Sequence, residues 1–157
     1  MRIFLSLLLV CIIVLLDQVS KYYVFDFLAN KPNNMMEITS FFNLVTVRNY
    51  GISFGMFNNL SYGKWILTIL AGSITIGLLY WLKITKTYYF SVALSLIIGG
   101  AIGNIIDRAY LGSVADFLDF HIFEYHWPAF NFADSYIFIG TMLVCLEQFF
   151  LSRKIRP

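Results

Sequence analysis

Four long apolar stretches constrain this chain more than any other feature of its sequence. Residues 65–82 and 88–106 carry no charged side chain, and residues 3–24 and 134–151 carry only a few. A helix needs about 20 apolar residues to cross the hydrocarbon core of a bilayer. The sequence therefore predicts four transmembrane helices over these ranges.

The composition supports a membrane as the surrounding solvent. The chain is 59% apolar and 13% charged, whereas a typical soluble domain is about 45–50% apolar and about 25% charged. A water-soluble fold of this size would leave roughly a third of its surface exposed, so it could not bury all of these apolar side chains. An ordinary cytosolic domain and a disordered chain are both excluded. The net charge of +2, carried by scattered basic residues, gives no support for nucleic-acid binding.

The first apolar stretch also resembles a secretory signal, because it follows Met1-Arg2. No small-x-small cleavage site follows it, and Val10 stands where a lipoprotein box needs a small residue before Cys11. We therefore expect the stretch to stay as the first helix. Cys11 and Cys145 lie inside apolar runs, where we expect buried thiols and neither a disulfide nor a metal site.

The orientation follows from the charges that flank the helices. With the N-terminus inside, six basic residues fall on the inner side and five on the outer side, so the count decides nothing. The inner segments are short and carry no acid except Glu147, whereas the outer half carries the other eight acids. This asymmetry predicts that both termini are cytoplasmic and that residues 25–62 and 109–132 form outer connections.

The first outer connection contains signals for a small sheet. A turn signal at Pro32-Asn33-Asn34 precedes the alternating, β-prone run Ile38–Val47. We expect this run to form a sheet at the membrane surface. Since no repeat, low-complexity tract or linker interrupts the chain, residues 1–157 are predicted to form one domain.

Polar residues collect near the predicted outer ends of the helices. Inserting a charged side chain at the centre of a membrane-spanning helix costs about 2.5–3.5 kcal/mol, so ionisable residues inside such helices usually serve a function. Asp17 lies seven residues before the predicted end of the first helix, which is roughly 10 Å along its axis. The others are Asn104, Asp107, Arg108 and Asp134. They could instead be helix-end residues wetted by the interface, and Asp17 with Lys21 could be an intrahelical ion pair.

The third helix shows how such residues can be aimed at one place. Gly100, Asn104 and Asp107 fall within about 60° of one another around a helix, which predicts a small and polar face that points into the bundle. Gly99 and Gly103 form a small-xxx-small pair that lets a neighbouring helix approach.

Asp116 and Asp134 are acids set among apolar neighbours. If the second outer connection folds back over the bundle, their carboxyls can face each other, and two adjacent carboxylates share one proton. Such a pair can deprotonate a water molecule while the protonated partner donates to a peptide carbonyl oxygen. A helix dipole would favour Asp134 as the anion and leave Asp116 with the proton. Capping or surface acids are the alternative.

Two other sequence patterns could indicate a serine nucleophile or a metal site, but both lack the required context. Gly51–Gly55 matches G-x-S-x-G, but that elbow needs an α/β sheet with acid and histidine partners, and the chain has no room for one. His121 and His126 could ligate a metal with Glu124, but their spacing is not H-E-x-x-H. We therefore expect no metal.

Five motifs, taken in order, resemble those of the bacterial lipoprotein signal peptidase, or type II signal peptidase, family. They are Asp17–Lys21, Asn49–Gly51 with Phe54-Gly55, Gly103–Arg108, Gly112–Phe117 and Phe130–Asp134. The resemblance extends over the whole chain, including the four predicted helices and both outer connections.

The resemblance implies an all-α integral membrane protein with four transmembrane helices and a small extracytoplasmic β platform and flap. It implies an aspartic endopeptidase of the bacterial cytoplasmic (inner) membrane, active near the outer face. Such an enzyme cleaves diacylglyceryl-modified prolipoproteins just before the lipidated cysteine.

The same resemblance places the catalytic pair on Asp116 and Asp134. Residues that hold the substrate or brace this pair fall on Asp17 with its partner Lys21, Asn49, Gly51, Asn104, Asp107, Arg108 and Asn131. It also implies contact with membrane lipid, inhibition by the cyclic peptide globomycin and no cofactor; we expect a monomer.

A small proton- or cation-coupled four-helix transporter is the alternative, because intramembrane acids occur in that class. Transporter sites lie near the bilayer midplane, often between inverted repeats. Here the central stretches of the second and third helices carry no charge. A structural assembly subunit is a third class, but it would not need an acid-rich outer rim.

Overall fold

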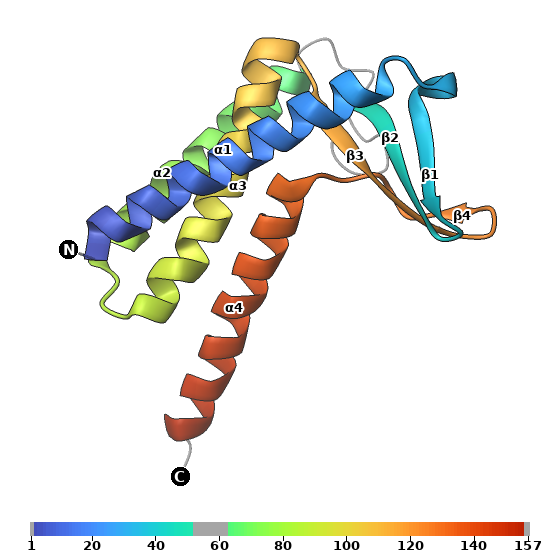
Figure 1. Cartoon of the computed structure of the whole chain (residues 1–157). Helices are drawn as coiled ribbons and strands as arrows, with labels where there is room; N and C mark the ends of the chain where they lie inside the picture. The colour runs from blue at the N-terminus through green and yellow to red at the C-terminus, as the bar shows by residue number, and fades with distance from the viewer. Residues whose placement is uncertain (1, 52–62, 156–157) are drawn as a thin grey trace.

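The computed structural model describes residues 2–51 and 63–155. Its four long helices are α1 (Arg2–Leu28), α2 (Gly63–Ile84), α3 (Tyr88–Leu111) and α4 (Phe132–Ile155). Each contains a segment long and apolar enough to cross a membrane. A small antiparallel sheet lies at one end of the helices (Figure 1). The expected combination of four apolar helices and a small sheet is therefore confirmed.

The predicted ends of α1 and α3 are too early. The first helix continues to Leu28 instead of residue 24, so Asp17 lies eleven residues, or roughly 16 Å, before its end. The third helix begins after Thr87, whose hydroxyl accepts the Phe90 N–H, and it ends at Leu111, before the C-cap Gly112 with a φ of 74°. This left-handed C-cap favours glycine, so α3 runs a full turn past Asp107.

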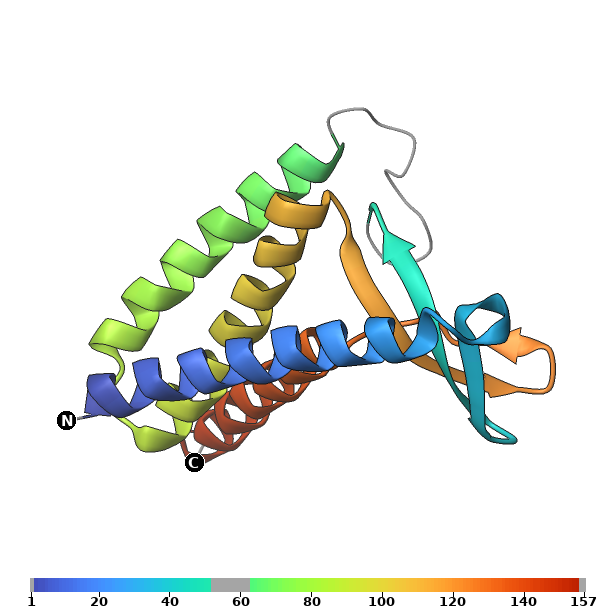
Figure 2. The same ribbon diagram turned by 45° about the horizontal axis from the view of Figure 1, so that its top comes forward.

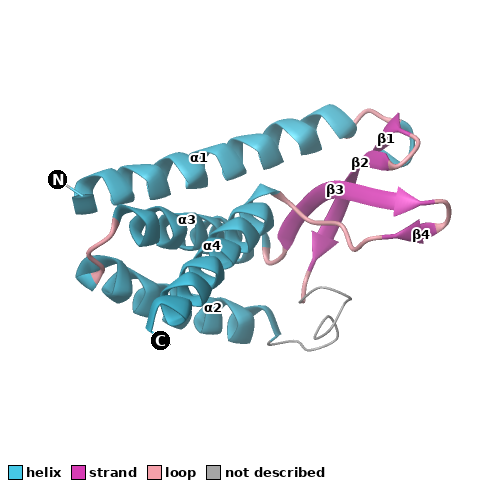
Figure 3. Ribbon diagram, turned by 90° about the horizontal axis from the view of Figure 1, so that it is seen from below, coloured by secondary structure: helices cyan, strands magenta, loops and turns pink. Residues whose placement is uncertain are grey.

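The central helix is α3, which packs against each of the other three. α1 and α2 lie on opposite sides of it (Figure 3). The face predicted to point inward is buried, since Gly100, Asn104 and Asp107 all lie in the interior. The polar groups of α3 are therefore held between helices and away from lipid.

Glycines allow this close packing. A Cβ atom on Gly99 would lie 2.7 Å from Ile13 Cγ2 of α1. A Cβ atom on Gly100 would collide with the carbonyl oxygen of Ala133 at the start of α4. Both neighbouring helices thus approach the α3 backbone at the level of the polar residues, as the small-residue spacing predicted.

The sheet has the order β1-β2-β3-β4, with all neighbours antiparallel. Its strands are β1 (Met35–Thr39), β2 (Phe42–Asn49), β3 (Val114–Ile122) and β4 (Tyr125–His126). The β-prone run Ile38–Val47 contributes to two of these strands, because a turn at residues 40–41 interrupts it. β3 and β4 lie in the second connection, where no strand was predicted. Because residues 114–117 are all buried, β3 lacks the alternation that marks a half-exposed strand.

Pairing of β2 with β3 joins the two long connections between helices, one after α1 and one after α3. Asn49 is opposite Val114, and Val47 is opposite Asp116. The start of α1 and the end of α4 lie at the end of the bundle away from this sheet (Figures 1 and 2). The expected flap and most of the Gly51–Gly55 pattern fall on residues 52–62, outside the described part of the chain.

The two cysteines differ from the prediction. Cys11 and Cys145 are both exposed on the outer surfaces of α1 and α4. The expectation of burial assumed an interior for every apolar run. A helix that faces lipid has no need to bury its apolar side chains, which is why so many large hydrophobic residues of these helices are exposed.

Replacement of Gly100 by alanine should weaken the packing between α3 and α4. The new methyl would meet the Ala133 backbone, which cannot rotate away, so we expect the free energy of unfolding to fall by about 1–3 kcal/mol. Gly77→Ala is the matched control, because a Cβ atom there meets nothing within 4 Å. It should be neutral or stabilising by about 0.5–1 kcal/mol. Unfolding in SDS-containing mixed micelles measures both, and equal stability of the two variants would contradict this packing.

Candidate active site

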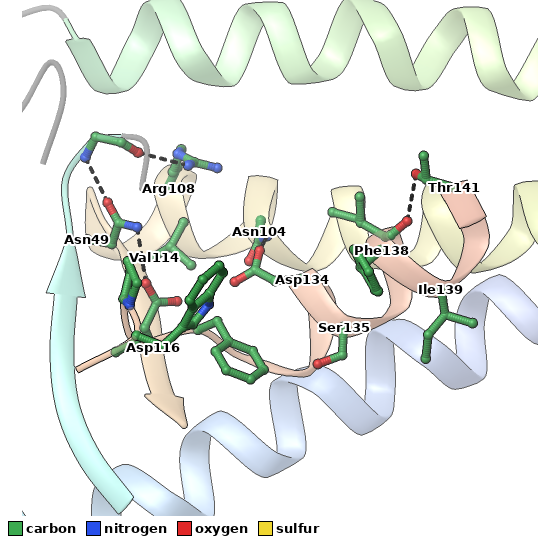
Figure 4. Close-up of a pocket in the computed structure, with 16 residues that line it drawn as sticks. Asn49, Asn104, Arg108, Val114, Asp116, Asp134, Ser135, Phe138, Ile139 and Thr141 are labelled. Atoms are coloured by element: carbon green, nitrogen blue, oxygen red, sulfur yellow. Dashed lines mark hydrogen bonds between the residues drawn. The ribbon is translucent and has the colours of Figure 1, made fainter. Parts of the chain in front are cut away.

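Asp116 and Asp134 line the same cavity, which has a volume of about 750 Å³. Asp116 is the third residue of β3 and is 1% exposed. Asp134 lies in the first turn of α4 and is half-buried. Figure 4 shows the two side chains on neighbouring walls of the cavity. The second connection has thus folded back over the bundle and brought the two acids to one place.

Asn131 joins the two carboxyls. Its Nδ2 donates to Asp116 Oδ1 at 2.6 Å, and its backbone N–H donates to Asp134 Oδ2 at 3.2 Å. Its own Oδ1 accepts the backbone N–H of Asp134 at 3.0 Å. Asn131 therefore caps α4 with a reciprocal pair of bonds that resembles a capping box. The local signal that starts the helix also orients Asp134.

Two further asparagines complete the set of donors. Asn104 Nδ2 donates to Asp134 Oδ1 at 2.8 Å, and Asn49 Nδ2 donates to Asp116 Oδ2 at 3.1 Å. Asn49 Oδ1 accepts the backbone N–H of Gly51 at 3.1 Å, which fixes the chain at the end of β2 (Figure 4). Each of the four carboxylate oxygens thus accepts one N–H, and both side chains are held in one orientation.

The surroundings of Asp116 change its protonation. Burial, followed by the negative charge of Asp134, raises the pKa of Asp116 to about 7, and the bonds from Asn49 and Asn131 oppose this only in part. Near neutral pH the Asp116 carboxyl therefore readily holds or releases a proton. An acid with this property beside a second carboxyl can act as a general acid or base.

Behind the cavity lies a buried cluster of charges. Lys21 Nζ is 2.7 Å from Asp17 Oδ2, as the spacing of an intrahelical pair predicted, and 2.9 Å from Asp107 Oδ2 of α3. A Cβ atom on Gly103 would collide with Asp17 Oδ2. The glycine thus leaves room for this carboxylate against α3, and the ion pairs offset the cost of burying the charges.

Arg108 faces the cavity from the last turns of α3. Its Nη2 donates to the Gly51 carbonyl oxygen at 3.3 Å. Its buried Nε has no hydrogen-bond partner within residues 2–51 and 63–155. The guanidinium also attracts the negative charge of the two aspartates.

The structure brings all ten predicted site residues to one end of the bundle. Those that line the cavity are Asn49, Gly51, Asn104, Arg108, Asp116 and Asp134. The buried residues Asp17, Lys21, Asp107 and Asn131 lie behind them. Lys21 and Asn131 bond to lining residues, whereas Asp17 and Asp107 accept the backbone N–H of the residues that precede Asp134 and Asp116. The cavity also has an apolar wall, including Trp127, Phe130, Ile137 and Phe138, that the sequence reasoning missed. Ile137 and Phe138 lie three and four residues after Asp134, so helical spacing could have identified them.

The two histidines lie away from the cavity lining. Their rings stack at 4.8 Å, and His126 Nδ1 is 2.9 Å from Asp119 Oδ1. Among the residues described, no group of three histidine, cysteine or acidic side chains is placed to hold a metal ion. The two histidines belong to the sheet, where Asp119 Oδ2 also accepts a hydrogen bond from Asn43 Nδ2 at 2.9 Å.

Comparison with known proteins identifies the family. A model of the family described as signal peptidase (SPase) II matches residues 9–150. The chain belongs to this family. Signal peptidase II enzymes are proteases, so the chain is a multi-pass membrane protease, and the transporter alternative loses its support.

Individual relatives agree with the family model. A lipoprotein signal peptidase of Alteromonas mediterranea is 41% identical over 86% of this chain and 75% of its own length. One from Aeromonas hydrophila is 44% identical over 88% of this chain and 84% of its own length. A bacterial membrane enzyme solved in meso at 2.3 Å resolution has a TM-score of 0.81 and 34% identity, over 96% of this chain and 91% of its own.

The raised pKa of Asp116 predicts how pH affects stability. The folded protein keeps the Asp116 proton up to about pH 7, whereas an unfolded aspartate releases it near pH 4. The folded state therefore binds more protons between these values. Wild-type stability should fall, relative to Asp116→Asn, as pH rises from about 4 to 7, and the difference should then level off.

Unfolding in SDS-containing mixed micelles at several pH values between 5 and 8 measures this difference. Asp26→Asn, at an exposed position of α1, serves as the control and should follow the wild-type pH dependence. Parallel curves for the wild type and Asp116→Asn would show that Asp116 titrates at its ordinary pKa.

Proposed function

We propose that this signal peptidase II is an aspartic endopeptidase that removes the signal peptide from diacylglyceryl-modified prolipoproteins. It cleaves the peptide bond just before the lipidated cysteine. The observation that carries the proposal is the pair Asp116 and Asp134, which lines one cavity and is bridged by Asn131. The lipoprotein signal peptidases to which the chain is similar support the substrate class.

In the proposed mechanism the two aspartates share one proton. Asp134, favoured as the anion by the α4 dipole, takes a proton from a water molecule as the water oxygen attacks the scissile carbonyl carbon. Protonated Asp116 donates its proton to the carbonyl oxygen, which gives a neutral tetrahedral gem-diol. Asp134 then passes its proton to the leaving nitrogen while Asp116 recovers one from a gem-diol hydroxyl, and the C–N bond breaks.

Arg108 and the asparagines orient the reactants. The guanidinium of Arg108 lines the cavity and is suited to attract a substrate carbonyl oxygen. Asn49 and Asn104 keep the carboxyls turned toward the scissile bond through the bonds described above. In this assignment Asp17, Lys21, Asp107 and Asn131 support the aspartates, and Gly51 shapes the cavity wall. No cofactor or metal ion takes part.

The cavity is suited to a substrate that arrives from the bilayer. Its wall continues along α4 from Asp134 to Ile137, Phe138 and Thr141, with mostly apolar side chains (Figure 4). A signal helix and acyl chains could therefore remain in lipid while the bond to be cut reaches the aspartates. A globomycin-type cyclic peptide would block the same cavity.

We place the sheet at the extracytoplasmic face of the bacterial cytoplasmic membrane, with both termini in the cytoplasm. The excess of acids in the two connections supports this orientation. The start of α1 and the end of α4 lie at the opposite end of the bundle from the sheet, which is consistent with it (Figure 1). The protein would act as one domain and as a monomer, in contact with membrane lipid.

Replacement of either aspartate should abolish processing. Asp116→Asn and Asp134→Asn keep the shape of the side chain but remove the group that carries the proton. We expect each to lower the cleavage rate of a purified diacylglyceryl-modified precursor by at least about 100-fold, the lower end of the usual acid–base contribution. Gel electrophoresis of the shortened product measures the rate.

The control Asp26→Asn makes the same chemical change at an exposed site outside the cavity and should leave the rate unchanged. Far-UV circular dichroism checks that all three variants keep the helical fold. Near-wild-type turnover by either cavity variant would remove that aspartate from the mechanism.

A further inference from the structure

Two backbone amides beside the aspartates have unusual partners. The N–H of Ala115, which precedes Asp116, donates to Asp107 Oδ2 at 3.0 Å. The N–H of Ala133, which precedes Asp134, donates to Asp17 Oδ1 at 2.9 Å. Each aspartate of the site is thus preceded by a residue whose amide bonds to a different buried carboxylate. Hydrogen bonds to a charged acceptor are about twice as strong as neutral ones.

Both of these carboxylates bind one cation. Lys21 Nζ lies 2.7 Å from Asp17 Oδ2 and 2.9 Å from Asp107 Oδ2. Its third contact is Asn104 Oδ1 at 3.2 Å. Its contacts with Asp17 and Asn104 are hydrogen bonds and its contact with Asp107 is an ion pair, and Lys21 is 4% exposed. Asn104 in turn donates to Asp134 Oδ1. Each partner of Lys21 therefore also bonds either to Asp134 or to the residue before one of the two aspartates.

A second side chain ties the same carboxylates together. Gln18 Nε2 lies 2.9 Å from Asp107 Oδ1 and 3.2 Å from Asp17 Oδ2. Asp17, Gln18 and Lys21 all lie on α1, and Asp107 lies on α3. The carboxylates are therefore fixed to the two helices that meet in the middle of the bundle. Asp107 and Asp17 thus connect the backbone of β3 and of the start of α4 to the same pair of packed helices, α1 and α3.

We propose that Asp17, Lys21 and Asp107 form a clamp that sets the separation of the Asp116 and Asp134 carboxyls by holding the amide that precedes each of them. This inference rests on the proposed function, because it assumes that the two carboxyls share a proton. Lys21, Asp17 and Asp107 are then positioning residues, since they act through the backbone and through Asn104.

The separation matters because the coupling between two carboxyls weakens with distance. Strong coupling moves their two apparent pKa values apart, so the form with one proton exists over a wide pH range. If the carboxyls drift apart, the two values converge and the bell-shaped pH profile of kcat becomes narrower. A loss of folded protein would lower this profile without changing its width.

The test removes the clamp while keeping its net charge. The clamp contains one cation and two anions, and the double variant Lys21→Met with Asp107→Asn leaves one anion. Among the residues that the structure describes, the charged groups next to the aspartates are Asp17 and Lys21 of α1, with Asp107 and Arg108 of α3. Lys21 acts electrostatically on both aspartates, so its loss displaces the whole bell along the pH axis, whereas a narrower bell reports a weaker coupling between the two carboxyls. The matched control is Lys83→Met with Asp26→Asn, at exposed positions of α2 and α1.

We expect kcat of the double variant on a synthetic diacylglyceryl lipopeptide, assayed in detergent, to fall about 100-fold, as small misplacements of catalytic groups commonly cause. The KM should change less than about threefold, and the bell should narrow. The control pair should match the wild type in all three measurements. Lys21→Arg keeps the charge but replaces a compact ammonium by a longer, planar group, so it should narrow the bell in the same way.

A folded double variant or a folded Lys21→Arg protein with a bell of wild-type width would overturn the clamp. If the double variant does not fold, Lys21→Arg decides the question alone; if neither folds, the cluster has a structural role and the proposal is rejected. Asp116→Asn and Asp134→Asn, assayed alongside, separate this inference from the proposed function. Activity in those two variants rejects the shared proton, whereas their inactivity with an unchanged bell in the clamp variants rejects the clamp alone.

Discussion

The structure depends on the burial of two neighbouring carboxyl groups in a protein that lies in a low-dielectric solvent. A buried acid is tolerated when each of its oxygens accepts a hydrogen bond. Here Asn131 meets part of this need for both acids and also begins α4. The strand that carries Asp116 and the helix that carries Asp134 are thus fixed by the same residue.

The sequence was sufficient to predict the main parts of this arrangement. Spans of about 20 apolar residues identified the four helices, because lipid imposes a length and a composition that water does not. The inward face of α3 followed from helical spacing, and the Asp17–Lys21 pair followed from a separation of four residues. These features depend on residues close in the chain.

The features that the sequence could not predict depend on residues far apart. β3 exists because β2 pairs with it, and its buried residues 114–117 give no alternating pattern. The contact of Lys21 with Asp107 joins α1 to α3 across the chain and has no local signal. The exposure of Cys11 on α1 depends on which face meets lipid, and an evenly apolar helix does not reveal that face.

The distribution of the two acids has a consequence for biosynthesis. Asp116 precedes the last helix, whereas Asp134 belongs to it. A ribosome therefore completes three hydrophobic segments and the first acid before the second acid leaves the exit tunnel. Under the proposed two-aspartate mechanism, hydrolysis has to await insertion of the final segment, and a chain that still lacks this segment is inert toward prolipoproteins.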